Sequence, residues 1–136
     1  MYNNILVAMA LDHNVSEKTI AIARQVLSDG GTITALHVVE EPQGTANLKL
    51  REDLLVQGTA RAQELFQEKL TSHPDIQPRM VQGHAARTVV EEAEKLGADL
   101  IVMGSHMPGL RDFFLGSTAS RVTSHAGCSV HVYRAG

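Results

Sequence analysis

Two short stretches of the 136-residue chain combine glycines with hydroxyl side chains in a way that suits the binding of an anion. The first is Gly104-Ser105-His106-Met107, and the second is Gly116-Ser117-Thr118. A glycine allows a ligand to approach the backbone closely. Backbone amides at the start of a helix are free to bind phosphate, and the helix dipole favours negative charge there. A nucleotide bound here would place its ribose near Gly104 and its phosphates at residues 116–118.

The second stretch also has a simpler explanation. Gly116-Ser117 is an ordinary way to start a helix, with Ser117 as an N-cap. The sequence contains neither a GxxxxGK[ST] phosphate-binding loop nor a GxGxxG motif after its first apolar run. The residues by themselves leave phosphate binding and plain capping both open.

Apolar runs alternate with helical patterns along the chain and predict one domain over residues 1–136. We expect strands at residues 4–10, 32–39, 77–81, 100–103 and 129–133, and helices at 16–28, 50–70, 86–96 and 117–125. Residues 29–31 should stop the first helix, and a loop should begin at Gly104. Strict alternation of strand and helix implies parallel strands with right-handed crossovers. The prediction is an α/β fold with a doubly wound, five-stranded parallel sheet of order 3-2-1-4-5 and helices on both faces.

A sheet of this order places its ligand site by topology. Ligands bind beyond the carboxyl ends of the strands, where the winding direction reverses. Here that point lies between the first and fourth strands. Residues 8–14 and 103–118 are therefore the segments expected to line the site.

Composition narrows the class of protein. The net charge is -3, so no basic excess is available to neutralise a nucleic-acid backbone. The longest apolar run is far shorter than a membrane span, and the opening MYNNILVAMALDHN lacks the basic start and cleavage site of a signal peptide. The single cysteine, Cys128, has no internal partner for a disulfide. We expect a cytoplasmic protein that binds neither nucleic acid nor membrane.

Several separated motifs occur in order between Asn4 and Arg134: NILVA, LHVVEEP, VQGHAARTVVEEAEKLGADLIVMGSH and LGSTASRVTSHAGCSVHVYR. Together they resemble the universal stress protein family. The ATP-binding branch of that family carries Gly-x2-Gly-x9-Gly-Ser/Thr, in which Gly104 and Gly116-Ser117 match the first and last glycines. The middle glycine falls on Met107, and the loop is one residue shorter. The resulting His-x-Pro form is similar to a short-loop subgroup that, by resemblance, still binds ATP.

The resemblance also assigns residues at the first two strands. The family commonly ends its first strand with Pro-x-Asp, where this chain has Ala8 and Ala10. Asp12 follows two residues later and is the best candidate for holding Mg²⁺. Val38 matches the apolar residue that is usually packed against adenine. The contacts implied for ATP, or for AMP or ADP in its place, are Ala8, Ala10, Asp12, Val38, Met103, Gly104, Ser105, His106, Met107, Gly116, Ser117 and Thr118.

The implied role is an adenine nucleotide-binding regulatory protein of the stress response. Two alternatives stay open: a nucleotide-free interaction module of the same fold, and a slow ATPase or autokinase. No catalytic base is identified beside Ser117 or Thr118. The last strand, from Ser129 to Arg134, alternates in polarity in a way that fits pairing with a copy of itself. The resemblance implies a homodimer formed by antiparallel pairing of that strand.

Overall fold

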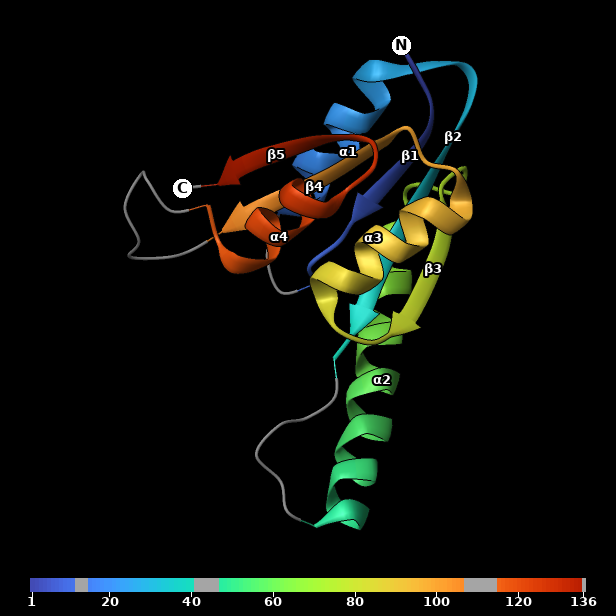
Figure 1. Cartoon of the computed structure of the whole chain (residues 1–136). Coiled ribbons are helices and arrows are strands. Elements are labelled where there is room, and N and C mark those ends of the chain that lie inside the picture. Colours follow the sequence, from blue (N-terminus) through green and yellow to red (C-terminus); the bar gives the residue numbers. More distant parts are fainter. Residues whose placement is uncertain (12–14, 41–46, 107–114, 136) are drawn as a thin grey trace.

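A computed structural model of the chain describes residues 1–11, 15–40, 47–106 and 115–135 (Figure 1). Its elements, in chain order, are β1 (Tyr2–Ala8), α1 (Val15–Val26), β2 (Leu27–Val39), α2 (Leu48–Leu70), β3 (Gln77–Gln82), α3 (Ala85–Leu96), β4 (Leu100–His106), α4 (Ser117–His125) and β5 (Ser129–Ala135). All neighbouring strands pair in parallel, in the order β3-β2-β1-β4-β5. The predicted fold class and strand order are confirmed.

The central strand β1 is buried on both faces. Ile5, Leu6 and Val7 have no exposed surface. Ile5 and Val7 point to one face and pack in a core with α1 and α2, whereas Leu6 points to the other face and packs with α3 and α4. This arrangement explains why the opening apolar run does not alternate with polar residues: parallel strands between two helical layers must be apolar on both sides.

Several predicted boundaries were wrong. The first strand was predicted to reach Ala10, but β1 ends at Ala8. The predicted loop from Gly104 does not begin there, because β4 continues to His106 by pairing with Tyr133–Ala135 of β5. The predicted helix stop at 29–31 lies inside β2 instead. The register of β2 shifts there, since Tyr2 pairs with Leu27 but Asn4 pairs with Thr32. Gly30 makes this irregularity possible by adopting a positive φ of 78°.

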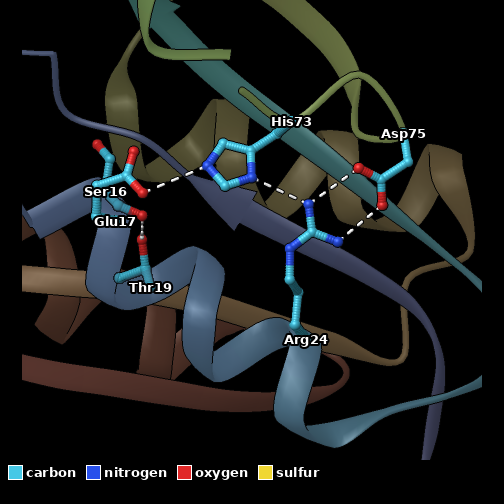
Figure 2. A network of polar contacts seen from close by, with 6 residues as sticks. All are labelled: Ser16, Glu17, Thr19, Arg24, His73 and Asp75. Atoms are coloured by element: carbon cyan, nitrogen blue, oxygen red, sulfur yellow. Dashed lines mark hydrogen bonds and ion pairs between the residues drawn. The ribbon is translucent and has the colours of Figure 1, made fainter. Parts of the chain in front are cut away.

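A polar network ties α1 to the connection between α2 and β3 (Figure 2). Arg24 donates two hydrogen bonds to the carboxylate of Asp75, at 2.7 and 2.9 Å. Arg24 also donates to Nδ1 of His73 at 3.0 Å, and because arginine only donates, that nitrogen must be the unprotonated one. The other ring nitrogen, Nε2, then carries the hydrogen and faces Glu17 at 3.3 Å. The network therefore favours one neutral tautomer of His73 and fixes α1 against the end of α2.

No helix among the described residues is long and apolar enough to cross a membrane.

The Arg24–Asp75 pair predicts a specific dependence of stability on pH. The hydrogen bonds from Arg24 lower the pKa of Asp75 to about 2, so the pair stabilises the fold above the pKa of an unfolded aspartate and loses that contribution as the pH falls. Asp75→Asn should be less stable than the natural chain at neutral pH. The gap should be constant above about pH 5 and shrink as the pH falls below about 4. Urea denaturation over this range measures it.

The matched control is Asp53→Asn, which removes an exposed carboxylate of α2. A gap between Asp75→Asn and the natural chain that stays the same at every pH would contradict the prediction.

Candidate functional site

A pocket of about 640 Å³ lies beyond the carboxyl ends of β1, β2 and β4. This volume is in the usual range for sites that bind small molecules. Strand residues and the segments that follow them line it: Ala8, Met9, Ala10, Leu11, Leu36, His37, Val38, Glu40, Met103, Gly104 and Ser105. The helices and the residues before them complete it: Gly58, Arg61, Ala62, Leu65, Ala85, Val89, Leu115, Gly116, Ser117, Thr118 and Ala119.

The pocket exists because β1 stops before its neighbours do. β1 pairs with β2 as far as Ala8, and Met9 adds one last hydrogen bond from its amide to the carbonyl of Leu36, at 2.8 Å. β2 continues to Val39 and β4 to His106. The strand that separates β2 from β4 is therefore missing at their tips, which leaves space between them.

One tip presents unpaired polar groups of the backbone to this space. In a parallel strand, successive residues direct their N–H and C=O groups alternately to the two neighbouring strands. Leu36 bonds toward β1, and Val39 bonds toward β3 by accepting from the amide of Gly83 at 3.0 Å. Val38 therefore directs its N–H and C=O toward the side that β1 has left. The two groups are a hydrogen-bond donor and a hydrogen-bond acceptor, and they are spaced as on the edge of a β-sheet.

The opposite side of the pocket is the start of α4. Gly116 precedes the helix with a φ of 95°, and its carbonyl accepts from the amide of Ser120 at 2.9 Å. The amides of Ser117, Thr118 and Ala119 have no partner within the helix, because the first turn has no preceding carbonyls to bond. A glycine N-cap supplies no side chain to satisfy them, and the first turn has no acidic residue. This helix start is therefore suited to an anion.

A contact between β4 and the segment before α4 supports this geometry. The hydroxyl of Ser105 donates to the carbonyl of Leu115. The bond links the end of β4 to the residue that precedes the helix N-cap. The turn before α4 is thus anchored to the sheet by a residue of the pocket itself.

The start of α3 also lies at the pocket, but one of its amides already has an acceptor in the protein. Its N-cap, His84, makes no side-chain capping bond. Glu40, which follows β2, takes that role, since its Oε1 accepts from the amide of Ala85 at 3.1 Å. The carboxylate fills the position that an external anion would need. Of these two helix starts, α4 is the one available to a phosphate.

Most of the predicted site residues line the pocket. These are Ala8, Ala10, Val38, Met103, Gly104, Ser105, Gly116, Ser117 and Thr118. Asp12 and Met107 lie outside the described residues. His106 is the last residue of β4, and its side chain is also outside the part that the structure describes. The contact with ligand assigned to each of these twelve positions stays a prediction.

Sequence reasoning missed the wall that α2 contributes, formed by Gly58, Arg61, Ala62 and Leu65. It also missed Glu40 and His37, whose Nδ1 lies 3.0 Å from the carbonyl of Met9. Glu40 follows directly on β2, so its position at the carboxyl edge of the sheet was a usable signal. The α2 residues carried no such signal, because only the packing of the helix against the sheet brings them to the site.

Within the described residues, no group of three or more histidine, cysteine, aspartate or glutamate side chains is arranged to hold a metal ion. Asp12, the residue predicted for Mg²⁺, lies outside that part of the chain.

Comparison with known proteins places this fold in a known context. The model of the universal stress protein family matches residues 1–134. The chain is 33% identical to universal stress protein G of Escherichia coli O157:H7, in an alignment that covers 98% of this chain and all of that protein. It superposes on the universal stress protein UspA of Lactobacillus plantarum with a TM-score of 0.80 and 26% identity, covering 98% of each chain.

Two more distant structures share the fold. One is a universal stress protein in complex with cAMP, with a TM-score of 0.66, 21% identity and 96% coverage of both chains. The other is the universal stress protein of Archaeoglobus fulgidus in complex with dAMP, with a TM-score of 0.62 and 18% identity, covering 96% of this chain and 97% of that one. Both of these proteins hold an adenine nucleotide.

The cap that Glu40 provides for α3 gives a stability prediction. Glu40→Ala should lower the free energy of unfolding by about 1 kcal/mol, because the amide of Ala85 loses its acceptor and the helix start loses a favourable negative charge. Chemical denaturation measures the loss. Glu91→Ala, which removes an exposed carboxylate from the same helix, is the control. Equal effects of the two substitutions would show that the contact with Ala85 contributes nothing.

Proposed function

We propose that this chain, which belongs to the universal stress protein family, is a regulatory protein of the stress response. It binds ATP across the tips of β1, β2 and β4. The observation that carries the proposal is the open start of α4, which faces a pocket whose far end is the backbone edge of Val38. These two features suit the two chemically different ends of a nucleotide.

The Val38 end suits the base. The six-membered ring of adenine carries a hydrogen-bond acceptor beside an amino donor, and a backbone N–H next to a C=O is complementary to that pair. Apolar side chains contribute to the pocket, since Leu36, Val89 and Met103 also line it. Burial of a flat ring against these side chains favours binding through the hydrophobic effect. The cAMP and dAMP complexes of the distant relatives have adenine in common, which supports this assignment.

The α4 end suits the phosphates. Free amides and the helix dipole favour negative charge, and the hydroxyls of Ser117 and Thr118 supply further donors. Gly104 lies between the two ends, where the absence of a side chain leaves room for a ribose. Calorimetry should show that the purified chain binds ATP in the micromolar range. Absence of heat at millimolar ATP, with and without Mg²⁺, would rule the proposal out.

Ser117→Asp tests the phosphate end. An aspartate in the first turn is favourable for the helix itself, so the variant should fold. Its carboxylate would occupy the anion site and repel phosphate, so the affinity for ATP should fall by at least about tenfold while that for adenosine changes little. Ser117→Ala keeps all the backbone amides and should retain most of the affinity.

These affinities are measured by calorimetry, with circular dichroism to compare the folds. If Ser117→Asp binds ATP as well as Ser117→Ala does, the phosphates are not at the start of α4.

The proposal includes a homodimer formed through β5. The two outer strands of the sheet differ in a way that supports it. β3 contains Pro78, which cannot donate to another strand, whereas β5 (SVHVYRA) has no proline. Val130 and Val132 of β5 pack into the core, and His131 between them is exposed. An antiparallel copy of β5 would pair with the backbone groups on its outer edge.

His131→Asp tests this edge. In an antiparallel pair centred near the middle of β5, the two copies of residue 131 lie close together, so two carboxylates would repel. We expect light scattering to show a dimer for the natural chain and a monomer for His131→Asp at micromolar concentration. His125→Asp, at an exposed site on α4, should remain a dimer. A dimer that survives His131→Asp, or a natural chain that is monomeric, would contradict the proposal.

A further inference from the structure

One wall of the pocket carries a positively charged side chain. Arg61 lies on α2 and lines the pocket together with Gly58, Ala62 and Leu65. Within the described part of the chain, the guanidinium of Arg61 makes no hydrogen bond or ion pair. Its neighbours on the wall are small or apolar. Arg61 is exposed at the side of the pocket, so its guanidinium is available to a ligand.

The position of α2 decides which part of a ligand Arg61 can reach. α2 packs against β2, and Phe66, one residue beyond Leu65, lies with its ring centroid 6.2 Å from that of His37 on β2. The first part of α2 continues past the carboxyl end of β2 and away from the sheet (Figure 1). Arg61 therefore stands beside the tip of β2, where Val38 presents its backbone edge.

The start of α4 is on the other side of β1, the strand at which the winding direction reverses. α4 packs against α3, β4 and β5, and Figure 1 shows it apart from α2. β1 lies between β2 and β4, and neighbouring strands are about 4.8 Å apart, so the two tips are separated by about 10 Å. Arg61 thus belongs to the base end of the pocket and not to the phosphate end.

We propose that Arg61 is a specificity-determining residue that lays its guanidinium over the face of the bound purine ring. This inference rests on the proposed function and names the residue that covers the base. A planar, delocalised cation stacks well on an aromatic face and is attracted by its π electrons. The wall beside Arg61 is open, because an added Cβ at Gly58, one helical turn before it, would meet no atom within 4 Å.

The ionic groups nearby are consistent with this role. Among the described residues, Glu40 is the carboxylate that lines this pocket, and its Oε1 accepts from the amide of Ala85. No ion pair joins Glu40 to Arg61 among the described residues. The apolar side chains around the pocket do not compete for the guanidinium. The planar ring of a base can therefore stack on the guanidinium of Arg61.

The test compares Arg61→Ala with the natural chain in binding adenosine, AMP and ATP by calorimetry. A contact with the base predicts that all three affinities fall by the same factor, about three- to tenfold. Arg61→Lys should recover only a small part of the loss, because an ammonium keeps the charge but has no plane to stack. Arg121→Ala removes the same charge from the exposed face of α4 and should leave all three affinities unchanged.

Two results would overturn the inference while the proposed function stands. Unchanged affinities in Arg61→Ala would show that the residue does not contact the ligand. A loss that grows from adenosine to ATP, and that Arg61→Lys restores, would show that the guanidinium binds phosphate. Failure of the natural chain to bind any of the three ligands would reject the proposed function itself, and the role of Arg61 with it. Thermal unfolding of each variant checks that the fold is intact.

Discussion

The pairing of β1 with both β2 and β4 is the constraint on which the rest of this structure depends. The chain leaves β1 in one direction to build β2 and β3, and later returns past it to build β4 and β5. Right-handed crossovers in the two directions place α1 and α2 on one face and α3 and α4 on the other. The winding direction therefore reverses at β1, and the pocket lies beyond its carboxyl end.

The polar groups around this pocket are distributed unevenly. The start of α3 is capped by Glu40, whereas the start of α4 has only a glycine before it and keeps its amides available. Val38 supplies a donor and an acceptor at the other end, and apolar side chains lie between them. A ligand with an anionic group at one end and a flat ring with polar edges at the other fits the pocket in one orientation only. Its anionic group would lie at the start of α4, and its ring would lie beside Val38. The difference between the starts of α3 and α4 thus makes the two ends of the pocket chemically different.

Much of the fold was predictable because the relevant signals are local. The glycine after Leu96 ends α3 in the left-handed conformation, as expected of a helix C-cap. The boundary errors arose where pairing between strands overrides local residue preferences. The sequence predicts a loop from Gly104, but its partner Tyr133 on β5 keeps it in the sheet. Similarly, the glycines at 30 and 31 were interpreted as a helix stop, although they mark a register shift within β2.

The order of the elements, the burial of β1 on both faces and the segments beside its carboxyl end could all be predicted from the amino-acid sequence. Each of these follows from residue types that are adjacent or periodic along the chain, so no long-range information is needed. The cap that Glu40 provides for α3 and the place of Arg61 in the pocket wall emerge only from the folded chain. Glu40 lies 45 positions before Ala85, and Arg61 lies 23 positions after Val38. Such contacts are set by how helices pack on the sheet, and packing leaves no pattern in the neighbouring residues.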